Sequence, residues 1–248
     1  MDFKGKRALV TGGAVRIGRA ICEALAARGA HVGIHYHRSY AAAQELQAVL
    51  EGHGVEAHLL EANLMTETAC NELMERARAV MGGVDILVNN ASVFHKHTLD
   101  AADMDTWLGE LWPNFFAPVQ LMRALAAAGS PARVVNLLDR RITTCDPAAV
   151  PYWISKRALA DVTRAAALHY APRLTVNAVA PGAVLPPPGQ DGSYLKEFAG
   201  PVPLDVQVTP ADVARAVLFL LENDTLTGQV LYTDGGQHLQ PNPPGDVS

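Results

Sequence analysis

The residues with the clearest chemical potential lie in two neighbouring stretches. "NLLDRR" (136–141) ends a hydrophobic run on a carboxylate, Asp139, and "YWISK" (152–156) follows it. Tyr152 and Lys156 are one helical turn apart, so they share a face if this stretch is helical. An ammonium beside a phenol lowers the phenol's pKa from its usual value of about 10. The pair could therefore move a proton, and Asp139 would point at it if the strand end faces the helix.

A second stretch near the start of the chain has the composition of a phosphate-binding turn. In "VTGGAVRIGRA" (10–20), Gly12, Gly13 and Gly18 allow a tight turn after a short hydrophobic run. Such a turn lets backbone N–H groups at a helix N-terminus approach a phosphate. Glycine turns also serve packing alone, but this one lies between the first strand and the first helix. Its position favours a dinucleotide site.

These stretches belong to a regular alternation of strands and helices. The candidate strands span residues 7–11, 31–36, 55–60, 84–89, 132–138, 174–180 and 229–233. The candidate helices span residues 17–28, 40–51, 67–80, roughly 103–128, 152–170 and 210–222. The strands are continuous hydrophobic runs, which indicates burial on both faces. We therefore predict an α/β fold with one doubly wound parallel sheet, a Rossmann fold, and helices on both faces.

The domain prediction follows from how little chain is left after the last irregular region. "PGAVLPPPGQDG" (181–192) breaks the pattern once, and only one helix and one strand follow it. That remainder is too short for a second domain. We expect one domain over residues 1–248, with a substrate lid around 181–208.

The composition limits which binding partners and which cellular compartment are expected. The net charge is −5 and no Lys/Arg-rich run occurs, which argues against nucleic acid. The chain has 3 cysteines, Cys22, Cys70 and Cys145, without CxxC spacing, and this fits a reducing compartment. There is no secretory segment or bilayer-length apolar run, so we expect a cytoplasmic protein without membrane contact. The two H-x-H pairs, His35 with His37 and His95 with His97, lack a Cys or carboxylate cluster, so no metal is expected.

The order and separation of five motifs resemble the short-chain dehydrogenase/reductase family. Besides the T-G-x-x-x-[G]-x-G turn they are "NNAS" (89–92), Asn114, Y-x-x-x-K (152–156) and "PG" (181–182). The resemblance implies that Tyr152 handles the proton and that Lys156 also holds the nicotinamide ribose. It also implies that Asn114 positions a water behind Lys156, in a helix kinked by the preceding proline.

The second strand indicates which nicotinamide cofactor is used. Enzymes that use NAD usually carry an acidic residue there, whereas no Asp or Glu occurs between Ala30 and Ala43. The strand instead ends in "HYHRS", where His37, Arg38 and Ser39 would suit a 2′-phosphate. NADPH is therefore the expected cofactor, unless Arg38 is only a solvated loop residue.

The family also implies contacts along the rest of the cofactor. Asn63 in "EANL" stands where the family commonly has an adenine-binding Asp, so weaker adenine recognition is expected. The complete expected cofactor set is Gly12, Arg16, Ile17, Gly18, His37, Arg38, Ser39, Asn63, Leu64, Asn90, Ala91, Ser92, Tyr152, Lys156, Pro181 and Gly182.

Within the family, the chain resembles the pteridine reductases. Most members carry Ser where this chain has Asp139, and the pteridine reductases carry this Asp, an Arg in "AVRIG", "HYHRS" and "NNAS-x-F". Matched residue by residue, the implied catalytic residues are Asp139, Tyr152, Lys156 and Asn114. The implied substrate residues are Arg16, Ser92, Phe94, Asp139 and Tyr152, with Phe94 stacking on a flat pterin. The alternative makes Asp139 a salt-bridge partner of Arg140 or Arg141, and Phe94 a core residue.

Three functions remain open on these grounds. The first is NADPH-dependent reduction of dihydropterins to their tetrahydro forms, with dihydrofolate as a further candidate substrate. The second is a general carbonyl or 3-oxoacyl-thioester reductase, against which Asp139 argues. The third is a non-catalytic NADP-sensing regulator, against which the intact Tyr152 and Lys156 argue. The helices over 103–128 and 152–170 resemble those through which the family forms tetramers, so a homotetramer is expected.

Overall fold

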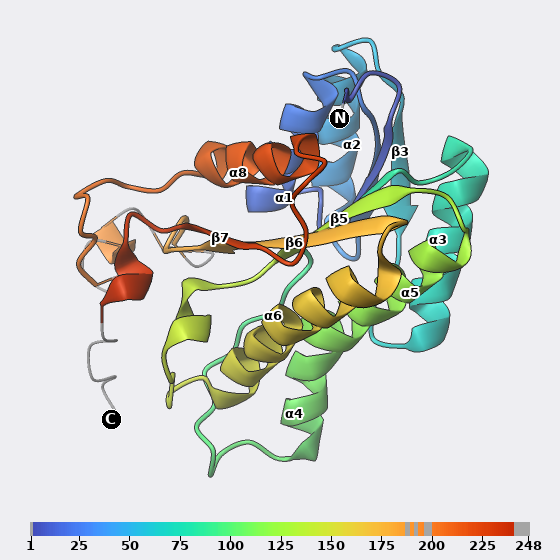
Figure 1. The fold of residues 1–248 in the computed structure, drawn as a ribbon. Helices are drawn as coiled ribbons and strands as arrows, with labels where there is room; N and C mark the ends of the chain where they lie inside the picture. Colours follow the sequence, from blue (N-terminus) through green and yellow to red (C-terminus); the bar gives the residue numbers. More distant parts are fainter. Residues whose placement is uncertain (1, 187–188, 191–192, 196–199, 241–248) are drawn as a thin grey trace.

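The protein is described from a computed structural model that covers residues 2–186, 189–190, 193–195 and 200–240. Seven strands form one sheet in the order β3-β2-β1-β4-β5-β6-β7, and every neighbouring pair is parallel (Figure 1). The strands are β1 (Arg7–Val10), β2 (His31–Tyr36), β3 (Ala57–Glu61), β4 (Ile86–Asn89), β5 (Ala132–Leu137), β6 (Leu174–Pro181) and β7 (Val230–Thr233). The direction of the winding changes between β1 and β4, which is where such sheets bind ligands.

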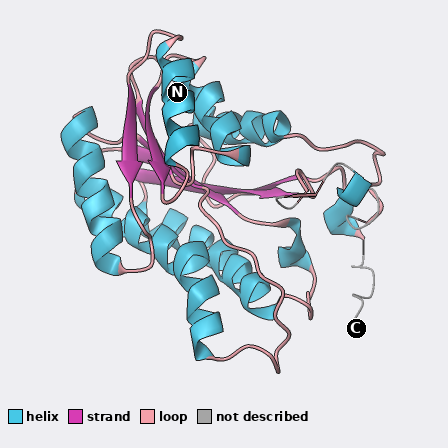
Figure 2. Ribbon diagram, turned by 180° about the vertical axis from the view of Figure 1, so that it is seen from behind, coloured by secondary structure: helices cyan, strands magenta, loops and turns pink. Residues whose placement is uncertain are grey.

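Helices cover both faces of this sheet (Figures 1 and 2). They are α1 (Arg16–Ala26), α2 (Tyr40–Glu51), α3 (Glu67–Met81), α4 (Met104–Leu111), α5 (Ala117–Ala127), α6 (Val150–Tyr170) and α8 (Pro210–Glu222). Buried side chains of α1, α2 and α8 form one apolar cluster with the sheet, and those of α3 and α5 form another. The predicted doubly wound α/β fold is thereby confirmed.

The strands are buried on both faces, as their sequence pattern predicts. In β1, Ala8 and Val10 join the cluster on the α1 side, whereas Leu9 joins the cluster on the α3 side. All three side chains are fully buried. A strand that alternates between two cores has no polar face, which explains its continuous hydrophobic run.

The predicted helix over residues 103–128 is interrupted at Pro113, where a kink was expected, but the interruption is a π-helical turn rather than a simple bend. The segment consists of α4, a π-helical turn at Trp112–Phe116 and α5. Pro113 has no backbone N–H and cannot complete a regular α-helical ladder, so an irregular turn is favoured there. The turn buries Asn114 against the middle of the fold. The third strand also begins at Ala57 rather than at 55.

The predicted lid over 181–208 lies partly outside the described residues, namely at 187–188, 191–192 and 196–199. Near its start, the Arg16 guanidinium donates to the carbonyls of Leu185 and Pro186, at 3.3 and 2.9 Å. Near its end, the Leu204 N–H donates to the Gly235 carbonyl at 3.1 Å. Within the described part of the chain, no helix combines the length and the apolar character needed to cross a bilayer.

Candidate active site

The glycine-rich turn between β1 and α1 depends on close backbone approach. Gly12 has a φ of +60°, and a Cβ there would lie 3.0 Å from the Ala91 Cα. A Cβ on Gly18 would lie 2.1 Å from the Gly12 carbonyl oxygen. No side chain fits in either space, so both positions require glycine. Glycines that allow such close backbone packing are typical of the turn that binds a dinucleotide phosphate at a helix N-terminus.

The buried His35, which was not expected to bind a metal, holds this turn. The Gly12 N–H donates to His35 Nδ1 at 2.9 Å, and His35 Nε2 lies 3.1 Å from the Ala62 carbonyl oxygen. Because Nδ1 accepts, the proton is on Nε2 and the ring is neutral. Burial lowers the pKa of His35 from 6.5 to about 4. The ring thus joins the turn to the end of β3.

The "NNAS" motif after β4 braces the same turn from the other side. Thr11 Oγ1 accepts from the N–H groups of Asn90 and Ala91, at 2.9 and 3.0 Å. The Asn90 amide donates to the carbonyls of Thr11 and Gly12, at 2.9 and 3.0 Å. The Asn90 side chain is therefore engaged with the turn itself.

The other expected cofactor residues surround this turn. His37 and Arg38 are exposed and Ser39 is half-buried, directly after β2. The side chain of Arg38 is exposed and forms no ion pair with another described residue. The glycine cradle and this cationic strand end fit the phosphates of a dinucleotide.

Five further expected residues lie around the same edge of the sheet. Asn63 is exposed and lines a cavity of about 450 Å³, whereas Leu64 is buried. Ile17 packs against the core from α1. Gly182, which follows Pro181 of β6, donates its N–H to the Thr233 carbonyl at 3.0 Å. The structure thus places these residues on the side of the sheet where the strands end.

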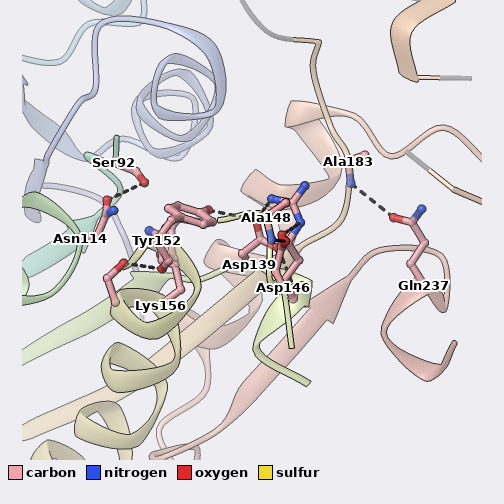
Figure 3. Close-up of polar contacts among 12 residues, drawn as sticks. Ser92, Asn114, Asp139, Asp146, Ala148, Tyr152, Lys156, Ala183 and Gln237 are labelled. Atoms are coloured by element: carbon pink, nitrogen blue, oxygen red, sulfur yellow. Dashed lines mark hydrogen bonds and ion pairs between the residues drawn. The ribbon is translucent and has the colours of Figure 1, made fainter. Parts of the chain in front are cut away.

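Three of the predicted catalytic residues, Asp139, Tyr152 and Lys156, meet between β5 and α6 (Figure 3). The Tyr152 hydroxyl donates to Asp139 Oδ2 at 3.0 Å, and Lys156 Nζ donates to the Leu137 carbonyl at 2.9 Å. Tyr152 and Lys156 are both buried, at 6% and 3% exposure. The strand-end carboxylate therefore does point at the tyrosine.

The electrostatics at this pair bear on the predicted tyrosine pKa. Lys156 and the positive nicotinamide of an oxidised cofactor were together expected to lower that pKa. Burial and the Asp139 carboxylate raise the pKa of Tyr152 well above its ordinary value. The phenol is therefore protonated at neutral pH. Burial lowers the pKa of Lys156 to about 8, against the opposing effect of Asp139 and Glu110. A protonated phenol can donate a proton in a reduction.

Asp139 also has the salt-bridge partner that the alternative prediction named. Its Oδ1 accepts from the Arg141 N–H at 2.8 Å, and its Oδ2 lies 3.7 Å from the Arg141 guanidinium. Arg141 also pairs with Asp146 at 3.3 Å. One carboxylate thus serves both the tyrosine and the arginine.

Phe94 is not the core residue that the alternative made it. Its side chain is 43% exposed. Its ring meets the Tyr152 ring edge-on, with centroids 4.7 Å apart, and the Arg141 guanidinium lies 5.1 Å from its centroid. Phe94 therefore offers an exposed aromatic surface beside the Tyr152 ring.

Asn114 faces the loop that carries Phe94. Asn114 Oδ1 accepts from the Ser92 hydroxyl at 2.8 Å and from the Val93 N–H at 3.0 Å, and Nδ2 donates to the Val93 carbonyl at 2.9 Å. Nδ2 also donates to Glu110 at 3.0 Å. Glu110 was not among the site residues predicted from the sequence, because its helical position alone gives no sign that it is buried.

The two H-x-H pairs have separate structural contacts. His35 holds the glycine turn, and His95 Nδ1 lies 2.7 Å from Glu110. Throughout the described ranges, no group of three or more His, Cys, Asp or Glu side chains has the geometry of a metal site.

Comparisons with known proteins agree with this geometry. A family profile described as enoyl-(acyl carrier protein) reductase matches residues 13–238. Pteridine reductase 1 of Leishmania tarentolae is 31% identical over 94% of this chain and 96% of its own length. The 3-oxoacyl-[acyl-carrier-protein] reductase FabG of Aquifex aeolicus is 32% identical over 95% of this chain and 98% of its own length.

Solved structures show the same relationship. FolM alternative dihydrofolate reductase 1 of Brucella canis, complexed with NADP, superposes with a TM-score of 0.92 at 34% identity, over 100% of this chain and 99% of that one. The Brucella suis protein of the same name, also with NADP, gives 0.91 at 35% identity, over 98% and 99%. With its motifs, its sheet order and these matches, the chain belongs to the short-chain dehydrogenase/reductase family.

Proposed function

We propose that this chain is an NADPH-dependent reductase of dihydropterins, with dihydrofolate as a further candidate substrate. The observation that carries the proposal is the hydrogen bond from the Tyr152 hydroxyl to Asp139 at 3.0 Å, next to the solvent-exposed ring of Phe94. A ring surface next to a proton donor and a carboxylate suits a flat heterocycle with N–H groups.

The cofactor part of the proposal rests on the glycine cradle and on "HYHRS". Arg38 is an exposed cation directly after β2, where a 2′-phosphate would lie, and no Asp or Glu occurs in the sequence between Ala30 and Ala43. The Brucella proteins of similar structure are described as complexes with NADP. When bound, NADPH would supply the hydride that reduces a C=N bond of the pterin ring.

The chain's own residues would handle the proton. Tyr152, protonated at neutral pH, donates its hydroxyl proton to the ring nitrogen beside the reduced carbon. Asp139 orients that hydroxyl and accepts an N–H from the heterocycle or relays the next proton. Lys156 stays positively charged as long as the pH is below its pKa of about 8.

We further propose a substrate lid at 181–208. The Arg16 guanidinium, which lies beside the glycine turn, donates to carbonyls at 185 and 186. A guanidinium between the cofactor cradle and this segment could close the segment over a bound substrate.

A 3-oxoacyl-thioester reductase is the competing function. The similarity to the Aquifex protein supports it. Asp139 argues against it, because a carboxylate 3.0 Å from the tyrosine hydroxyl would repel the alkoxide that develops when a carbonyl is reduced.

One assay separates the candidates. Purified protein is mixed with NADPH and, in turn, with dihydrobiopterin, dihydrofolate and an acetoacetyl thioester, and NADPH oxidation is followed. We expect turnover with dihydrobiopterin, and little or none with the thioester. Turnover of the thioester alone would contradict the proposal, and no turnover with any of the three would favour a sensing role.

A further inference from the structure

The described part of the chain buries the carboxylates of Glu110 and Asp234, neither of which the proposed reaction uses, and Glu110 is the one that contacts the loop carrying Phe94. Glu110, near the end of α4, has a side chain only 1% exposed. Its Oε1 accepts from the His95 N–H at 2.9 Å and from His95 Nδ1 at 2.7 Å. Its Oε2 accepts from Asn114 Nδ2 at 3.0 Å. A charge buried this deeply needs such hydrogen bonds to be tolerated.

These bonds complete an anchor for the loop 92–95. Asn114 binds the loop at Ser92 and at both backbone groups of Val93. Glu110 binds it at His95, on the other side of Phe94. The aromatic residue is therefore held at the residues before and after it, although its own ring is 43% exposed.

We propose that Glu110 is a positioning residue that fixes the Phe94 ring against Tyr152, so that a flat substrate finds a preformed stacking surface. This inference rests on the proposed function for its substrate, but the loop anchoring does not. A stacked ligand gains from a ring that is already ordered, because binding then costs less side-chain and loop entropy.

Glutamine is the sharpest replacement, because it keeps the shape and removes one acceptor. The donors of His95 meet Oε1, and the donor of Asn114 meets Oε2. A glutamine amide must turn its NH₂ group towards one of these donors. Asn114 cannot turn over in response, because its own oxygen and nitrogen are both paired with Val93.

The first test needs no substrate. Amide hydrogen exchange is measured for the segment around Val93 and His95 in Glu110→Gln and in Asp105→Asn, an exposed acid on the same helix. We expect the Val93 and His95 amides to exchange at least roughly tenfold faster in Glu110→Gln than in the wild type, and at the wild-type rate in Asp105→Asn. Native exchange rates in that variant would overturn the inference.

The second test separates positioning from general structural damage. Glu110→Gln should raise the KM for dihydropterin by roughly tenfold while the Kd for NADPH stays unchanged. In a Phe94→Ala background the same change should have little effect, because the ring that Glu110 positions is gone. Equal effects in both backgrounds would overturn the inference.

A second variant guards against misfolding. His95→Ala removes the side-chain donor at an exposed position and leaves the backbone donor, so it should raise the KM several-fold, again only when Phe94 is present. An unchanged KM in this variant would overturn the inference. If the wild-type protein reduces no dihydropterin, the proposed function fails, whereas the exchange result still decides whether Glu110 anchors the loop.

Discussion

At the residue scale, Asp139 is the residue that distinguishes the proposed pterin site from the carbonyl-reducing site common in the family, which has Ser at this position. Its Oδ2 accepts from the Tyr152 hydroxyl at 3.0 Å. General acid–base catalysis by a positioned side chain typically raises the rate by roughly 10²–10⁴-fold. We therefore expect Asp139→Ala to lose pterin reduction by about that factor in kcat, while the Kd for NADPH stays unchanged.

Two further variants sharpen that prediction. Asp139→Ser restores the common family residue, so it should not rescue pterin turnover but should admit some carbonyl reduction. Asp146→Asn is the control, because Asp146 pairs with the same Arg141 at 3.3 Å without contacting Tyr152. Near-native pterin turnover in Asp139→Ala would make the residue structural.

Arg38 decides cofactor preference at the same scale. A charge-assisted hydrogen bond is worth about 1.5–3 kcal/mol, so Arg38→Ala should weaken NADPH binding at least tenfold and leave NADH binding nearly unchanged. Fluorescence titration with both cofactors measures this. Arg28→Ala is the matched control, because Arg28 pairs with Glu222 on α8. Unchanged constants for both cofactors would refute the assignment.

At the element scale, periodicity predicted nearly every strand and helix within about two residues, because a strand buried on both faces has a distinctive run of apolar residues. Periodicity could not reveal the π-helical turn at Trp112–Phe116, since α and π turns bury similar apolar patterns. Contacts such as His35 to Gly12 or Glu110 to His95 join separate elements. Only the folded chain brings those residues together.

His35 makes the link between β2 and the glycine turn sensitive to acid. Its pKa is about 4 in the folded protein, against an ordinary value of 6.5. As the pH falls below 6.5, the unfolded chain takes up a proton that the folded chain does not. The stabilisation is therefore complete above pH 6.5 and is lost between 6.5 and about 4. It amounts to on the order of 3 kcal/mol.

Urea unfolding of the wild type and of His35→Gln, at several pH values in that window, isolates this contribution from that of the carboxylates. The free energy of unfolding should fall more steeply with acidification in the wild type, and the variant should be the less stable one near pH 7. Parallel pH profiles would show that His35 does not titrate as its burial implies.

At the scale of the whole molecule, α5 and α6 leave an apolar groove on the surface. Its volume is about 320 Å³, and it is lined by Val119, Met122, Val162, Ala165, Ala166, His169 and Tyr170. The neighbouring Leu168 is 85% exposed. A single exposed leucine needs no partner. Beside a groove on the two helices through which the family is expected to form tetramers, it favours a contact between protein chains. We propose that the groove is part of the interface of a homotetramer.

Light scattering at micromolar concentration should therefore give a mass near four times the chain's 26.4 kDa. Ala165→Arg should shift that mass towards smaller species, because it places an unpaired cation in the centre of an apolar contact, where losing water costs several kcal/mol. Ala41→Arg, an equally exposed position on α2, should leave the assembly intact. A clean monomer in the wild type would refute the proposed assembly, and a tetramer that survives Ala165→Arg would place its interface elsewhere.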